Sequence, residues 1–249
     1  MKHMIVTAYF KIPSKQSHEF YKPHIARFLG FIETAIIFCT TPDLVEWIKS
    51  LRPKHLPPLK FILYNSIYEI ESFKKYGVEF WEFQYSIDPS KCHTKELSAL
   101  WSNKKDFVLR AIEETRLEEP YIWADVGCAR DDCVNESLKN FGKNIRVIPA
   151  NKILIQLLNP HVPQKKFFTL PDVYVAGAIM AAYKDGWSAY KEEYEKTVAE
   201  YIQGTICADS DQYITASTLV RCPDIFEYVV YDVNLHPRID EWFFFLNYL

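Results

Sequence analysis

An apolar segment that ends in a carboxylate and a glycine constrains the fold of this chain more than any other feature. Residues 121–124 read Tyr-Ile-Trp-Ala and lead directly to Asp125, which Gly127 and Arg130 follow. Such a run is typical of a buried strand that delivers its last side chain to the edge of a sheet. In open α/β sheets, ligands bind outside the carboxyl ends of the strands. We therefore predict that Asp125 faces a ligand, the alternative being a carboxylate that only caps the turn after the strand.

Strand-like and helix-like segments alternate before this point. Three near-continuous apolar runs predict strands covered on both faces, and segments with apolar residues at helical spacing separate them. The predicted strands are 4–10, 34–39 and 60–64, and the predicted helices are 17–29 and 44–51. Strands that alternate with helices favour parallel βαβ units. The predicted fold class is thus α/β, with a central, mostly parallel twisted sheet flanked by helices.

Composition excludes several classes of protein. The chain has 249 residues, 49% of them hydrophobic and 24% charged, with a net charge of -3. This size and composition suit one substantial core, and the charge provides no basic field for nucleic acid. No window contains the roughly 18 consecutive apolar residues of a transmembrane segment. The six cysteines lack the spacing of a disulfide scaffold, so we expect reduced thiols in a cytoplasmic protein.

Residues 95–115 show the strongest helical pattern in the sequence. Apolar residues recur there at i, i+3 and i+4, and Lys104 lies on the same stripe, between Leu97 and Phe107. A lysine on a buried helix face is unusual. Either its stem packs while its ammonium reaches water at the edge, or the ammonium points at an anionic ligand above the sheet. The pattern alone leaves both alternatives open.

The second half of the chain predicts further elements. Residues 144–149 form a short predicted strand, and residues 173–182 form an apolar run that passes through Gly177. Residues 187–201 have the pattern of a second amphipathic helix. The aromatic tail, residues 242–249, is too apolar to extend into solvent, so we expect it to dock on the core.

Several polar residues of this half have structural explanations. Asp209 and Gln212 match the D-x-x-Q pattern of a capping box at the start of a third helix. The helix dipole favours Asp211 in the first turn in any case. His236 is a candidate metal ligand, although a single loop histidine is more often structural. The sequence contains no G-x-x-x-x-G-K-[ST], G-x-G-x-x-G or G-x-S-x-G motif.

Five short motifs of this chain occur together in one order. They are Ile5-Val-Thr-Ala-Tyr-Phe10, Glu96-Leu97 with Trp101-x-x-Lys104, Trp123-x-Asp125-x-Gly127-x-x-Arg130, Ala176-Gly177 and Asp211-Gln212. The ordered set resembles the HtrL/YibB (WlaTC-like) family of glycosyltransferase-like proteins over nearly the whole chain. That family is similar to GT-A glycosyltransferases, which have one α/β sandwich and use nucleotide-sugar donors. The resemblance implies a single domain over residues 1–249, with a nucleotide-sugar-binding half at about 1–130 and an acceptor half at about 131–249.

The resemblance also implies roles for individual residues. The end of the first strand, Thr7-Ala8-Tyr9, would lie beside the donor nucleotide, and Asp125 corresponds to a carboxylate of the D-x-D motif that binds Mn²⁺ or Mg²⁺. Asp211 is the candidate catalytic base on the acceptor side. The residues implied in binding are Thr7, Ala8, Tyr9, Lys104, Asp125, Gly127, Arg130, Gly177 and Gln212.

The strand end departs from the family pattern. It reads Asp125-Val-Gly127, so one of the two usual carboxylates is missing. Either a weaker metal site is completed by other side chains, or Arg130 and Lys104 offset the phosphate charge without a metal. Arg130 has the further alternative of pairing with a nearby aspartate. The residues that would complete a metal site are Asp131, Asp132 and His236.

The leading hypothesis is a glycosyltransferase that moves a sugar from a nucleotide-sugar donor to a glycan or lipid-linked acceptor. Surface polysaccharide or glycoconjugate synthesis is the process that the resemblance implies. One alternative is a catalytically silent nucleotide- or sugar-binding module, motivated by the missing carboxylate. Another is a Mg²⁺-dependent α/β hydrolase or phosphatase that uses Asp125 with Asp131 or Asp132. Exposed aromatic residues would suit a peripheral membrane contact, and the oligomeric state is left open.

Overall fold

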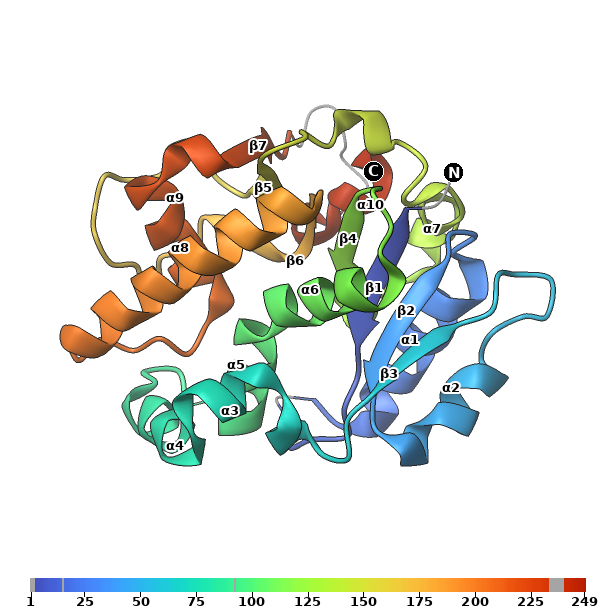
Figure 1. Ribbon diagram of the computed structural model, residues 1–249, viewed down its shortest axis with the longest axis horizontal. Coiled ribbons are helices and arrows are strands. Elements are labelled where there is room, and N and C mark those ends of the chain that lie inside the picture. The colour runs from blue at the N-terminus through green and yellow to red at the C-terminus, as the bar shows by residue number, and fades with distance from the viewer. Residues whose placement is uncertain (1–2, 15, 92, 233–239) are drawn as a thin grey trace.

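The computed structural model describes residues 3–14, 16–91, 93–232 and 240–249. Its centre is a seven-stranded sheet with the strand order β3-β2-β1-β4-β6-β5-β7 (Figure 1). The strands are β1 Met4–Ala8, β2 Ile36–Thr40, β3 Lys60–Leu63, β4 Tyr121–Ala124, β5 Ile153–Leu157, β6 Val175–Ala182 and β7 Phe226–Val230. The predicted fold class, an α/β fold with a mostly parallel sheet flanked by helices, is confirmed.

The strand directions determine which ends of the chain segments meet. β1, β2, β3 and β4 are mutually parallel, and β6 pairs antiparallel with both β4 and β5. Trp123 in β4 stands opposite Val6 in β1 and Met180 in β6. The beginning of β6 therefore lies at the same sheet edge as the ends of β1 and β4, and the Asp125 N–H donates to the Ala178 carbonyl oxygen at 2.8 Å.

Helices cover both faces of the sheet, because the strand side chains are apolar on both sides (Figure 1). One face packs against α1 His18–Phe31, α2 Val45–Ser50, α7 Asn135–Asn140 and α10 Phe245–Tyr248. The other packs against α3 Glu71–Tyr76, α4 Val78–Ile87, α5 Lys95–Ser102, α6 Lys104–Thr115, α8 Lys184–Gln203 and α9 Asp211–Arg221. None of the helices in the described residues has the length and apolarity to cross a membrane.

Two predicted elements are wrong in detail. The single helix over residues 95–115 is divided at Asn103, whose Oδ1 accepts from the Ser72 N–H at 2.8 Å, so that Lys104 begins α6. The strand predicted at 144–149 is a single 3₁₀ turn, Ile145–Val147. The next strand, β5, begins only at Ile153.

The aromatic tail docks on the core as predicted. Phe245 and Leu246 are buried in the cluster on the α1 face of the sheet. The Asn144 N–H donates to the Leu249 carbonyl oxygen at 2.6 Å, and the Asn144 side chain donates to the Tyr248 carbonyl oxygen at 2.9 Å. This docking brings Phe243, just before α10, to the sheet edge where β4 ends.

Candidate active site

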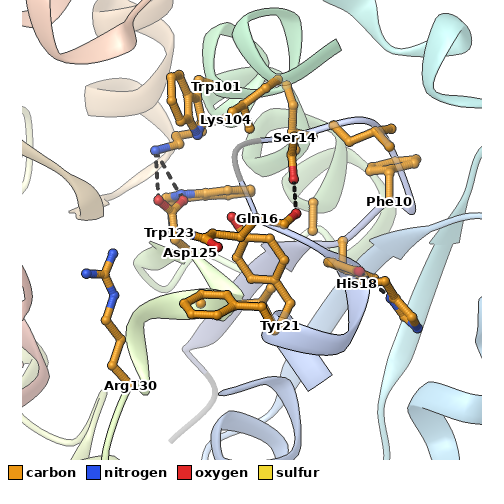
Figure 2. A pocket seen from close by; sticks show the side chains of 18 of the residues that line it. Phe10, Ser14, Gln16, His18, Tyr21, Trp101, Lys104, Trp123, Asp125 and Arg130 are labelled. Carbon is orange, nitrogen blue, oxygen red and sulfur yellow. Dashed lines mark hydrogen bonds and ion pairs between the residues drawn. The ribbon is translucent and has the colours of Figure 1, made fainter. Parts of the chain in front are cut away.

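A pocket opens at the carboxyl ends of β1 and β4, where parallel strands commonly bind ligands (Figure 2). The cavity has a volume of about 200 Å³. Its walls come from the end of β1, the start of α1, the inner face of α5 and the residues after β4. The lining includes Ala8, Tyr9, Phe10, Gln16, His18, Phe20, Tyr21, Leu97, Trp101, Lys104, Trp123, Asp125, Gly127, Arg130 and Phe243.

Asp125 lies at the pocket rim with its side chain 31% exposed. Its Oδ1 accepts a hydrogen bond from the Trp123 indole N–H at 2.8 Å, and its Oδ2 accepts from Lys104 Nζ at 3.1 Å. The carboxylate makes no capping bond to the 3₁₀ turn that follows it. The structural alternative considered for Asp125 is therefore not the observed arrangement.

Lys104 is buried beneath the pocket and does not extend to solvent. Its Nζ lies 3.1 Å from Asp125 and 2.8 Å from Asp211 Oδ2, and it donates to the Gly177 carbonyl oxygen at 2.8 Å. Burial is the largest single influence and opposes the charged form, but the two carboxylates together raise the pKa of Lys104 above its usual value. Lys104 is therefore a charged link between the end of β4 and the start of α9.

A second cavity, of about 320 Å³, lies on the other side of this link. Asp211, Gln212 and Gly177 line it, and Gln212 donates to the Val175 carbonyl oxygen at 2.9 Å. Burial raises the pKa of Asp211, against the opposing effect of Lys104. The residues common to both cavities are Tyr21, Leu97, Trp101, Lys104, Asp125, Arg130 and Phe243.

Arg130 contributes to both cavities and stacks on an aromatic ring. Its guanidinium carbon lies 4.6 Å from the centre of the Phe243 ring. The two aspartates that follow have other partners, since Asp132 pairs with Arg27 at 2.7 Å and Asp131 accepts from the Cys133 N–H at 2.9 Å. Figure 2 shows Arg130 on the side of the pocket where Asp125 lies.

The predicted donor residues at the end of β1 divide into two groups. Ala8 and Tyr9 line the first cavity, whereas Thr7 is buried within the strand and lines neither cavity. The Tyr9 hydroxyl is hydrogen-bonded to His18 Nδ1, and burial raises the pKa of Tyr9 to about 12. Gly127 also lines the cavity, where an added Cβ would lie 3.4 Å from the Tyr21 ring.

Apart from Tyr9, sequence reasoning missed the aromatic residues that line the pocket as functional candidates. His18, Phe20 and Tyr21 from the start of α1 and Trp101 from α5 all line it. Tyr21 and Trp101 lie on the apolar stripes that predicted their helices, and such stripes are ordinarily core. The available signal was the density of aromatic residues in the segment just after the first strand.

A metal ion at the end of β4 would need a second ligand beside Asp125, and the neighbouring described residues do not provide one. Both Asp125 oxygens already accept hydrogen bonds, and Gly127 has no side chain to serve as the second ligand. The cation in contact with Asp125 is the Lys104 ammonium. The binding of Mn²⁺ or Mg²⁺ by Asp125 therefore stays a prediction, and His236 lies outside the described residues.

A different cluster in the described residues has the composition of a metal site. Asp88, His93 and Asp209 each place one ligand atom within 4.8 Å of the others. The prediction that Asp209 begins a capping box is wrong, because its carboxylate lies against His93. The N-cap of α9 is instead Ser210, whose side chain makes no capping bond. His93 lines the second cavity.

No protein-family model and no curated protein sequence matches this chain. Among solved structures, the chain is similar to mouse xyloside xylosyltransferase 1 in its apo form, with a TM-score of 0.52 and 12% identity over 92% of this chain and 85% of that chain. A glycosyltransferase involved in the glycosylation of the major capsid of PBCV-1 matches with a TM-score of 0.47, at 12% identity over 99% of this chain and 89% of that chain. CMP:2-keto-3-deoxy-manno-octonic acid synthetase complexed with CTP matches with a TM-score of 0.43, at 10% identity over 93% of this chain and 91% of that chain. The first of these similarities shows that the fold is the GT-A-like α/β fold.

Proposed function

We propose that the protein is a glycosyltransferase that moves a sugar from a nucleoside diphosphate donor to a hydroxyl group of a glycan or lipid-linked acceptor. The observation that carries the proposal is the pair of adjoining cavities that share Asp125, Lys104 and Arg130. Sugar transfer needs two substrates that meet at one reacting carbon. Two cavities with common charged residues at the carboxyl edge of a GT-A-like sheet meet that need.

The first cavity is the proposed donor site. Its aromatic walls, which include Tyr9, Tyr21 and Trp101, offer ring faces to a nucleobase. Arg130 carries a guanidinium that suits bidentate binding of a diphosphate oxygen pair, and its stacking on Phe243 orients it. Stabilising the negative charge that develops on the leaving diphosphate is the main electrostatic task in such a transfer.

The second cavity is the proposed acceptor site, with Asp211 as the base. The acceptor hydroxyl would transfer its proton to the Asp211 carboxylate as its oxygen attacks the sugar carbon, and the diphosphate would leave. Lys104, 2.8 Å from Asp211 Oδ2, holds the carboxylate in place and favours its charged form before the proton arrives. Transfer of this kind inverts the configuration at the sugar carbon. The acceptor class and the link to surface polysaccharide synthesis rest on the sequence resemblance alone, which no family model matches.

Thermal unfolding against a panel of nucleoside diphosphates and their sugar conjugates, with and without Mn²⁺, tests the donor class. A ligand that binds only the folded state raises Tm by mass action. We expect one nucleotide to raise Tm, and Arg130→Ala to remove that shift while Arg27→Ala, a control on the neighbouring Asp132 ion pair, retains it. Release of the nucleoside diphosphate only when an acceptor is present, with the sugar joined to that acceptor, then indicates a transferase, whereas free sugar released without an acceptor indicates a hydrolase. No shift with any nucleotide would overturn the proposal, and a shift without turnover would favour the silent binding module.

A further inference from the structure

Three side chains from separate segments meet beside the second cavity. Asp88 follows the last residue of α4, His93 precedes α5, and Asp209 precedes α9. His93 Nδ1 lies 2.9 Å from Asp209 Oδ2 and 3.4 Å from Asp88 Oδ2. Asp209 is separated from the other two by more than a hundred residues, so the cluster is a product of tertiary structure.

The burial of this cluster leaves its negative charge poorly compensated. The side chains of Asp88 and Asp209 are only 1% and 3% exposed, and that of His93 is 17% exposed. Among the described residues, neither aspartate forms an ion pair with a lysine or arginine. Buried charges are normally paired, and one imidazole offers at most one positive charge to two carboxylates.

The ion pairs of the described residues supply no further cation to the cluster. The Lys104 ammonium, on the other side of the cavity, is already bound by Asp125 and Asp211.

The separations within the cluster suit a metal ion. Nitrogen and oxygen ligands about 2.1 Å from a metal stand about 3.0 Å apart at adjacent octahedral positions and about 3.4 Å apart in a tetrahedron. The separations observed from His93 Nδ1 to the two carboxylates are 2.9 and 3.4 Å. We propose that Asp88, His93 and Asp209 bind one divalent transition-metal ion, of the Zn²⁺ or Mn²⁺ class. An imidazole ligand favours such ions over Mg²⁺ and Ca²⁺, which prefer oxygen ligands.

The residues around the cluster hold its ligands in position. The Ser90 N–H donates to Asp88 Oδ1 at 2.7 Å, and the Ser90 hydroxyl lies 2.7 Å from both carboxylate oxygens, which holds the carboxylate with Oδ2 3.4 Å from His93 Nδ1. The edge of the His93 ring packs against Trp101, with 5.0 Å between the ring centres. Hydrogen-bonded carboxylates and oriented imidazoles are the usual supports of a metal site.

An ion at this position would connect α4, α5 and the start of α9. Asp211 lies two residues after Asp209, so the ion would also fix the first turn of α9 at the wall of the second cavity. This site is separate from Asp125 and does not depend on the proposed transferase activity.

Metal binding to the untagged protein of residues 1–249, stripped with EDTA and desalted, tests the proposal. We expect equilibrium dialysis to give one equivalent of Zn²⁺ or Mn²⁺, and Tm to rise by about 5 °C at a hundredfold excess over Kd. Mg²⁺ at the same concentration should give no comparable shift. Asp209→Asn and His93→Gln should each lose the bound equivalent, whereas Asp125→Asn, the control at the carboxylate after β4, should keep it.

A measurement on the wild-type protein covers the case in which the variants fail to fold. Electron spin-echo modulation of the Mn²⁺-loaded protein should show a directly bound histidine nitrogen. Absence of a stoichiometric ion, or of the nitrogen signal, would overturn the proposal. An ion lost from Asp125→Asn and kept in Asp209→Asn would overturn it as well and would assign the metal to the end of β4.

Discussion

Gly177 leaves space that the Asp211 carboxylate occupies: a Cβ added at position 177 would stand 2.7 Å from Asp211 Oδ2. The Gly177 carbonyl oxygen also accepts a hydrogen bond from Lys104, which itself lies 2.8 Å from that same carboxylate oxygen. The absence of a side chain at the start of β6 therefore lets Asp211 and Lys104 meet.

Gly177→Ala is expected to impair both stability and activity. The added methyl group must displace Asp211, and overpacking of this kind typically costs about 1–3 kcal/mol. We expect a lower free energy of unfolding in urea and at least a tenfold lower transfer rate. Gly30→Ala in α1 is the control, since a Cβ added at position 30 would meet nothing within 4 Å among the described residues. Equal effects of the two substitutions would contradict the close-packing argument.

Lys104→Met is expected to destabilise the protein. The change leaves Asp125 and Asp211 without their shared cation, and loss of one partner from a buried ion pair costs about 3–5 kcal/mol. We expect a value near the lower limit because Asp125 is partly exposed. Chemical denaturation measures the effect, and adding Asp211→Asn should restore part of the loss. A double variant no more stable than Lys104→Met would show that the pairing contributes little.

Asp125→Asn is expected to retain the fold and to lose the proposed transfer activity. The side chain sits at a pocket rim and fills little of the core, so the Tm should change by only a few degrees. Loss of its charge removes one of the two carboxylates that hold Lys104, and we expect at least a hundredfold fall in kcat/KM. Asp132→Asn, at an exposed carboxylate paired with Arg27, should leave kcat/KM unchanged. Wild-type turnover by Asp125→Asn would exclude this carboxylate from catalysis.

His3 is expected to make the protein less stable in mild acid. Its two ring nitrogens are buried and have no hydrogen-bond partner among the described residues, and burial lowers its pKa from 6.5 in the folded state, with Glu119 partly opposing. The unfolded chain therefore binds the proton more readily, so stability present at neutral pH is lost as the pH falls below about 6.5. Tm measured from pH 7.5 to 5 should fall less in His3→Gln than in wild type. His161→Gln, at an exposed position, should follow the wild-type curve.

The strands and the carboxyl edge that carries the candidate site could be predicted because their signals are local. The runs at 4–10, 34–39 and 60–64 are apolar enough to indicate strands with two covered faces, and all three are present. The strand predicted at 144–149 was wrong although it rested on the same kind of local signal, because the backbone of this short segment closes a 3₁₀ turn. A short run with several apolar residues does not by its pattern alone distinguish a strand from a helical turn.

The partners of the site residues could not be predicted because they depend on distant segments. Lys104 could be recognised as an anomaly on a buried stripe, but its contacts with Asp211 and Gly177 follow from the antiparallel entry of β6. The interpretation of Asp209 as part of a capping box failed similarly, because His93 competes for its carboxylate from 116 positions away. Local rules describe what a residue can do with its sequence neighbours and contain no information about such competitors.

The reversed direction of β6 has an evolutionary consequence. Because β6 runs antiparallel to β4, its first residues lie at the same edge of the sheet as the last residues of β1 and β4. The two cavities therefore depend on different parts of the sequence. Ala8 and Tyr9 at the β1 end, with His18 and Phe20 of α1, line only the first cavity, whereas Gly177, Asp211 and Gln212 line only the second. If the proposed function holds, acceptor preference can diverge through mutations in the later part while the nucleotide requirement is inherited unchanged.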